Sequence, residues 1–104
     1  MEFIGTFFLV FTVGMVSIDP GAGGFAGLAI GTVLAVMIYA GGHISGGHYN
    51  PAVTLAVCLR DMATTSGAVA YWVAQALAGA AAAAVVLFLK DSSATVATSK
   101  RCLC

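Results

Sequence analysis

The sequence predicts an all-α integral membrane protein with three transmembrane helices and one re-entrant half-helix. Of its 104 residues, 61% are hydrophobic and 8% are charged, and the mean hydropathy is +1.03. A soluble domain carries about 25% charged residues. The charged residues also stand apart, so that uncharged stretches cover residues 3–18, 20–59 and 62–89. Because a helix needs roughly 20 apolar residues to cross a bilayer, these stretches have room for the predicted spans.

The first span is predicted over residues 3–18, and the sequence Asp-Pro-Gly at 19–21 ends it. A signal peptide is the alternative for this segment. Such a peptide begins with a basic region, however, and this chain has no Lys or Arg before Arg60. Glu2 is either a surface charge or an acid at the membrane edge that needs a partner.

The second span is predicted over residues 25–42. Gly27, Gly31 and Ala35 share one face of this helix, a spacing that allows membrane helices to approach closely. A general abundance of small residues is the alternative explanation, since the chain has 13 glycines.

The third span is predicted over residues 67–89, and Tyr71 and Trp72 near its start suit the interfacial aromatic belt. Gln75 is the strongly polar side chain of this span, and we expect it to bond a neighbouring helix rather than to line a pore. Residues 90–104 are rich in Ser and Thr and are predicted to form a disordered or foreign tail.

The stretch SGGHYNPAVT, residues 45–54, is a polar interruption between these apolar segments. Its glycines argue against a regular helix over residues 41–49, whereas Asn50 is a favoured N-cap and Pro51 suits the first helical position. We therefore predict a helix over residues 51–59, about 13 Å long at 1.5 Å a residue and so about half of a bilayer. The charged pair at 60–61 must lie in water, which predicts that the chain dips to mid-membrane and returns as this half-helix.

A half-helix that begins at mid-membrane predicts a filter for neutral solutes. Its N-terminus carries about half a positive charge, which repels cations and protons. The Asn50 amide can donate to a passing solute, and the carbonyl groups of Gly46, Gly47 and His48 can accept from it. Donors and acceptors along a narrow pore, with a positive barrier, exclude ions and protons. An ordinary capped helix after a loop is the alternative, because Asn-Pro-Ala is a short match.

The sequence lacks the residue patterns that several classes of function need. His43 and His48 have no carboxylate or thiol partners at ligand spacing, so we predict no metal site and no cofactor. The chain has no activated nucleophile, acid–base pair or phosphate-binding loop, which argues against an enzyme. The formal net charge of zero gives no reason to expect a nucleic-acid partner.

The residues GHISGGHYNPAVT, at 42–54, closely resemble the first signature loop of the aquaporin and aquaglyceroporin family, the major intrinsic proteins. The segments MEFIGTFFLVF, GFAGLAIG and YWVAQALAG resemble the first three helices of that family, in the same order. The resemblance covers residues 1–89. It implies a midplane signature formed by Asn50, Pro51 and Ala52, and a cytoplasmic pore half lined by the carbonyl groups of Gly46, Gly47 and His48.

The resemblance also implies roles for residues outside the signature. Glu2 and His43 would support the loop, with the Glu2 carboxylate accepting its hydrogen bonds. Ile30 would stand in the outer selectivity ring, where many water-selective members carry an aromatic residue. An isoleucine there would widen the ring and make it less polar, which favours ammonia, urea or small polyols such as glycerol.

The family is built from two inverted halves, and this chain resembles only the first. It is therefore expected to be a channel half for passive permeation of water or small neutral solutes. It would lie in the lipid bilayer of a plasma or inner membrane, as a multi-pass protein and, if complete, as a homo-oligomer, the family tetramer. A lone half would leave the polar backbone of residues 43–50 facing lipid. We thus consider a truncated product, a pore of oppositely inserted copies, and a non-conducting interaction subunit.

Overall fold

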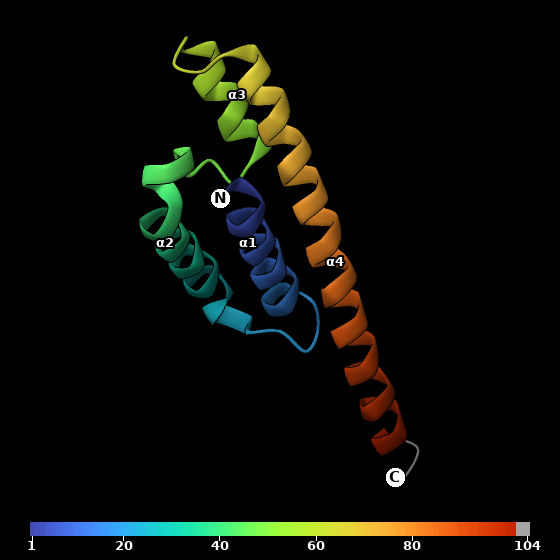
Figure 1. Ribbon diagram of the computed structural model, residues 1–104. Coiled ribbons are helices and arrows are strands. Elements are labelled where there is room, and N and C mark those ends of the chain that lie inside the picture. The colour runs from blue at the N-terminus through green and yellow to red at the C-terminus, as the bar shows by residue number, and fades with distance from the viewer. Residues whose placement is uncertain (102–104) are drawn as a thin grey trace.

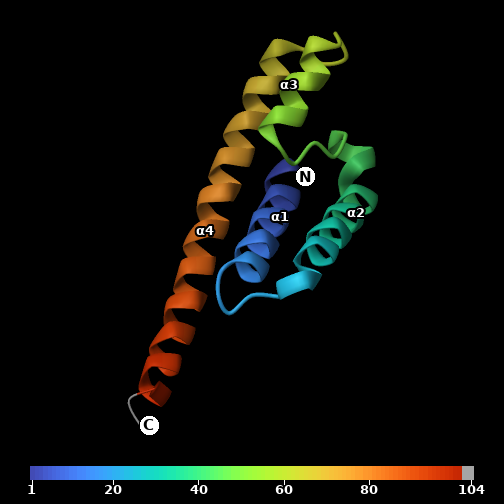
Figure 2. The ribbon, with the colours of Figure 1, turned by 180° about the vertical axis from the view of Figure 1, so that it is seen from behind.

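The computed structural model describes the backbone of residues 1–101 and the side chains of residues 1–91. The described chain is all-helical, and its element order is α1 (Glu2–Ser17), the short 3₁₀ helix η1 (Gly23–Phe25), α2 (Ala26–Ser45), α3 (Pro51–Leu59) and α4 (Thr65–Arg101). In Figure 1, α1 lies between α2 and α4, and α3 packs against the first turns of α4. The view from behind shows the same arrangement (Figure 2). The loop of residues 46–50 crosses the N-terminal end of α1.

Two of these helices are long and apolar enough to cross a bilayer, Gly23–Ser45 and Thr65–Asp91. The third apolar helix, α1, is shorter at 16 residues. Large apolar side chains are exposed on these helices, among them Phe25, which is 74% exposed, and Phe88, which is 73% exposed. In water such exposure would be unfavourable, whereas in a bilayer these side chains contact lipid.

Small residues let α1 and α4 pack closely. Ala78, Ala82 and Val86 are buried and follow one another at intervals of four residues, which places them on one face of α4. A Cβ atom added at Gly14 of α1 would come too close to the Val86 side chain. The approach of the two helices thus depends on the missing side chain at Gly14.

The end of α2 corrects one sequence prediction. Residues 41–49 were expected to be irregular, but α2 continues to Ser45. Gly41 lies within the helix and packs its bare backbone against the side chains of Met1 and Tyr49, where a Cβ atom would clash with both. The helix ends instead at Gly46, whose φ of +83° is the left-handed conformation that commonly terminates helices.

The tail also differs from the sequence prediction of disorder over residues 90–104. Helix α4 continues to Arg101, while residues 102–104 lie outside the described chain. Extending an existing helix needs no new nucleus, and Ser and Thr cost only fractions of a kcal/mol each. The polar segment also starts from an anchor, because the Lys90 ammonium donates to the carbonyl oxygens of Ile18, at 2.8 Å, and Pro20.

Candidate functional site

The short helix α3 begins with a side-chain cap. Asn50 is extended, with φ of −152°, and its Oδ1 accepts from the Ala52 N–H at 2.9 Å. Pro51 occupies the first helical position, where its missing N–H leaves no hydrogen bond unmade. The cap leaves the amide NH₂ of Asn50 exposed. The loop therefore ends in a free amide donor beside the positive end of a helix.

The loop before this cap has an unusual backbone. Gly46, Gly47 and Tyr49 all have positive φ, at +83°, +67° and +50°. The carbonyl oxygens of Gly46, Gly47 and His48 accept no hydrogen bond from the described part of the chain. These three sequence-predicted acceptors thus lie in succession along the chain, with their hydrogen-bonding capacity unused within it.

The carboxylate of Glu2 accepts hydrogen bonds from the loop and from the helices beside it. It is buried, at 4% exposed, and accepts four hydrogen bonds. Oε1 accepts from Ser45 Oγ at 2.8 Å and from the His48 N–H at 3.1 Å. Oε2 accepts from the Tyr49 N–H at 2.7 Å and from Gln75 Nε2 at 2.9 Å. One side chain of α1 thereby joins α2, the loop and α4.

The ring of Tyr49 fills the space between α1 and α2. It is 1% exposed, and its hydroxyl donates to the Met37 carbonyl at 2.9 Å. A Cβ atom at Gly5 or at Gly41 would clash with this side chain. A tyrosine with positive φ is unusual, and here two glycines and the Glu2 carboxylate hold it in place.

Gln75 and Thr54 connect α4 to α3. Gln75 Nε2 donates to Thr54 Oγ1 at 3.1 Å as well as to Glu2. Thr54 Oγ1 also lies 3.1 Å from His48 Nδ1 and 3.2 Å from the Asn50 carbonyl oxygen. The prediction that Gln75 bonds a neighbouring helix is confirmed. Sequence reasoning missed Thr54, although its position four residues after Asn50 places it one turn into α3.

Tyr71 and Trp72 touch the backbone at the two ends of the loop. The Tyr71 hydroxyl donates to the Ser45 carbonyl at 2.7 Å, and its ring meets the His48 ring edge to face at 5.2 Å. Trp72 Nε1 donates to the Pro51 carbonyl at 3.1 Å. A hollow of about 360 Å³ lies beside Tyr71, His48 and Thr54. The sequence suggested only an interfacial belt for this aromatic pair.

Two predicted site residues lie away from this network. Ile30 is half-buried in α2, fifteen positions before Ser45, which separates it from the loop by roughly 22 Å at 1.5 Å a residue. His43 is exposed in the last turn of α2 and makes no hydrogen bond to the loop in the described structure. In the described structure the loop N–H groups of His48 and Tyr49 donate to Glu2, which Gln75 also bonds. The loop-supporting role of His43 stays a prediction. Within the described residues, no three His, Cys, Asp or Glu side chains gather as a metal site.

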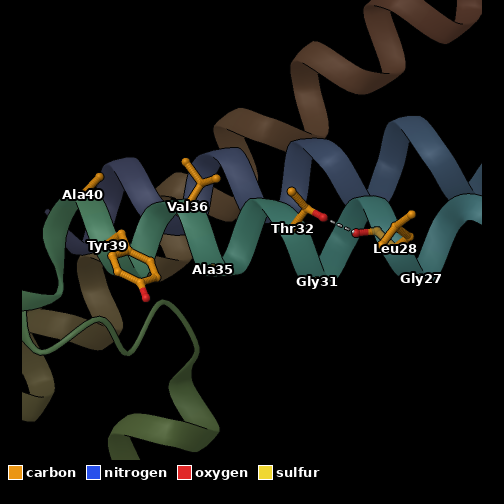
Figure 3. A pocket seen from close by; sticks show the side chains of 8 residues that line it. All are labelled: Gly27, Leu28, Gly31, Thr32, Ala35, Val36, Tyr39 and Ala40. Atoms are coloured by element: carbon orange, nitrogen blue, oxygen red, sulfur yellow. Dashed lines mark hydrogen bonds between the residues drawn. The ribbon is translucent and has the colours of Figure 1, made fainter.

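The outward face of α2 forms a shallow apolar groove of about 820 Å³. Figure 3 shows Gly27, Gly31 and Ala35 in a row along it. A Cβ atom at Gly27 or Gly31 would meet nothing within 4 Å. The close helix approach that this spacing predicted is therefore not made within the described chain.

The described chain is all-helical, two of its helices are long and apolar enough to cross a bilayer, and a polar loop joins α2 to α3. These features are typical of helical membrane proteins. The family model for "Major intrinsic protein" matches residues 1–102, and the chain belongs to this family. The match includes most of residues 90–104, which the sequence predicted to be a disordered or foreign tail.

Individual relatives agree with this assignment. The chain is 44% identical to Aquaporin Z of Brucella melitensis over 95 residues, which is 85% of this chain and 41% of the relative. It is 43% identical to glycerol uptake facilitator protein-like 6 of Lactiplantibacillus plantarum, covering 82% of this chain and 40% of that one. It is 44% identical to Aquaporin NIP1-4 of rice, Oryza sativa, covering 85% and 34%. The chain thus spans about two-fifths or less of these relatives, and no solved structure matches it.

Proposed function

We propose that the chain forms one half of a passive membrane channel for water or small neutral solutes. Helices α1, α2 and α4 are the three spans in this proposal, and α3 is a re-entrant half-helix. The observation that carries the proposal is the geometry around Asn50. Its oxygen caps α3 at 2.9 Å, while its exposed amide and the free carbonyl groups of Gly46, Gly47 and His48 can exchange hydrogen bonds with a solute.

The charge distribution favours a neutral solute over an ion. Glu2 is the carboxylate at the loop, and four donors already occupy its oxygens. The N-terminus of α3 presents a partial positive charge to whatever approaches Asn50. A cation would meet this barrier at a low-dielectric position, and a proton passed along a water file would meet it as well.

The choice among neutral solutes rests on Ile30. In this proposal Ile30 lines the outer part of the pore, far from Asn50, and its aliphatic side chain leaves room for glycerol, urea or ammonia besides water. The names of the relatives, Aquaporin Z and glycerol uptake facilitator protein-like 6, support both water and glycerol as candidate solutes.

The surface that carries the carbonyl groups of Gly46, Gly47 and His48 also needs a covering partner. Backbone carbonyl groups without hydrogen bonds are tolerated at membrane depth only when protein covers them or when they line a watery cavity. We propose that a second half-channel of the same family provides this cover. The partner is either a complementary half or an oppositely inserted copy of this chain. Interaction with a full-length channel, without flux, is the remaining possibility.

Osmotic swelling of proteoliposomes tests the proposal with water, glycerol and urea. The chain is reconstituted alone, and also together with the second half of Aquaporin Z from Brucella melitensis. Flux from the chain alone would support oppositely inserted copies, and flux only with the complementary half would support a half-channel. Asn50→Leu removes the amide and should abolish either flux, whereas Tyr39→Phe, on the outward face, should not. Absence of flux under both conditions would overturn the channel proposal.

A further inference from the structure

Consecutive aromatic residues of α4 donate hydrogen bonds to both ends of the loop. The Tyr71 hydroxyl donates to the carbonyl oxygen of Ser45, the last residue of α2. The indole N–H of Trp72 donates to the carbonyl oxygen of Pro51, the first residue of α3. Neighbouring residues of a helix point about 100° apart, so one turn of α4 reaches both places.

The two acceptors are suited to this arrangement. A carbonyl group at the C-terminal end of a helix lacks a helical donor, and Tyr71 supplies one to Ser45 at 2.7 Å. A carbonyl group in the first turn of a helix has a helical donor but keeps a second lone pair. Trp72 uses this second position on Pro51 at 3.1 Å.

We propose that Tyr71 and Trp72 act as positioning residues that fix the separation of the two loop ends. This inference rests on the proposed function, because what they position is the pore-facing backbone and the Asn50 amide. The five loop residues, 46–50, are anchored in the middle by Glu2, which accepts from the N–H groups of His48 and Tyr49. At the two ends, Glu2 also accepts from Ser45 Oγ and Gln75 donates to Thr54 Oγ1, but these bonds hold side chains. The aromatic pair holds the backbone carbonyl groups of both ends, which fixes their separation.

Each member of the pair controls one end. Loss of the Trp72 N–H loosens the start of α3, where Asn50 caps the helix, and leaves Gln75 bonded to Thr54 there. The end of α2 stays held by Tyr71. Loss of the Tyr71 hydroxyl loosens the end of α2, where the Gly46 N–H bonds the Gly42 carbonyl at 2.8 Å, and leaves the Ser45 side chain bonded to Glu2. A residue that merely contributed to overall stability would loosen both ends together.

Site-resolved hydrogen exchange of the reconstituted chain tests this inference. Trp72→Phe and Tyr71→Phe each remove one donor and keep a ring. Trp72→Phe should speed exchange at the Ala52 and Thr54 amides about fivefold, the factor expected for one lost hydrogen bond, with less than a twofold change at Gly46. Tyr71→Phe should do the reverse. Tyr39→Phe removes a hydroxyl from an 89% exposed ring on α2 and is the matched control, with no change expected at either end.

Two outcomes would overturn the inference. One is faster exchange by the same factor at both loop ends and at the Gly5 amide of α1, which would show a general loss of stability. The other is unchanged exchange in both variants. The measurement needs no solute flux. If no solute flux is found but amide exchange changes at one loop end in each variant as predicted, the proposed function is contradicted and the positioning role is supported.

Discussion

Two pairs of glycines in this chain have opposite surroundings, since one pair is tightly packed and the other faces open space. Gly5 and Gly41 face the Tyr49 side chain, and a Cβ atom at either position would clash with it. Gly27 and Gly31 line the outward groove of α2 and would meet nothing. The comparison teaches that small residues at helical spacing do not by themselves show which face of a membrane helix is packed.

Threonine side chains near the loop and on the outward face of α2 also differ in their surroundings. Thr54 is 1% exposed and has contacts to three other residues around the loop, Gln75, His48 and Asn50. Thr32 lies on the outward face, and its hydroxyl donates to the carbonyl of Leu28 in its own helix at 2.7 Å (Figure 3). Both hydroxyls donate to the carbonyl group four residues earlier, which is compatible with lipid. The Thr54 oxygen also accepts from Gln75 of α4, so Thr54, unlike Thr32, joins its helix to another.

The largest expected effect is at Glu2. Glu2→Ala removes the acceptor of four hydrogen bonds, and each buried donor left without a partner costs about 1–3 kcal/mol. We expect the free energy of unfolding in mixed micelles to fall by about 3 kcal/mol or more. Glu2→Gln is the control, because it keeps the volume and one acceptor oxygen and should lose less. A loss below about 0.5 kcal/mol for Glu2→Ala would contradict the central place given to this carboxylate.

Next in size is a direct test of the glycine comparison. Gly5→Ala forces a methyl group into the Tyr49 ring, and such overpacking costs about 1–3 kcal/mol. Gly31→Ala adds the same methyl group in open space and should stabilise the helix by up to about 1 kcal/mol, because alanine is the better helix former. The difference in unfolding free energy between the two variants is the measurement. Equal effects would show that the two faces are equally packed.

Local chemistry explains which parts of the structure could be predicted. Asn50 and Pro51 specify the start of α3 through a cap that involves only neighbouring residues, and α3 runs over Pro51–Leu59 as the sequence indicates. Contacts between distant residues behave differently. Glu2 and Gln75 meet across 73 positions, and in this sequence nothing local distinguishes Gly41, which continues a helix, from Gly46, which ends one. The contacts of Tyr71 and Trp72 with Ser45 and Pro51 were not predicted for the same reason.

A smaller effect is expected for the threonine pair. Thr54→Val keeps the shape and removes the oxygen that accepts from Gln75, while Gln75 keeps its bond to Glu2. The unfolding free energy should therefore fall by about 1–2 kcal/mol. Thr32→Val on the outward face should change it by less than about 0.5 kcal/mol. Both are measured in the same mixed micelles. A greater loss for Thr32→Val would reverse the comparison between the two regions.

The smallest effect should come from the end of the bundle opposite the loop. Lys90 is 9% exposed, and its ammonium bonds the carbonyl oxygens of Ile18 and Pro20, where α1 ends and its dipole is negative. Lys90→Met keeps an apolar stem and removes the donors, which should cost about 1 kcal/mol. Protease cleavage within residues 18–24 should become faster, while exchange at the Ala52 amide stays unchanged. Faster exchange at Ala52 would show that this end and the loop are coupled through α4, and the two regions would then no longer be independent.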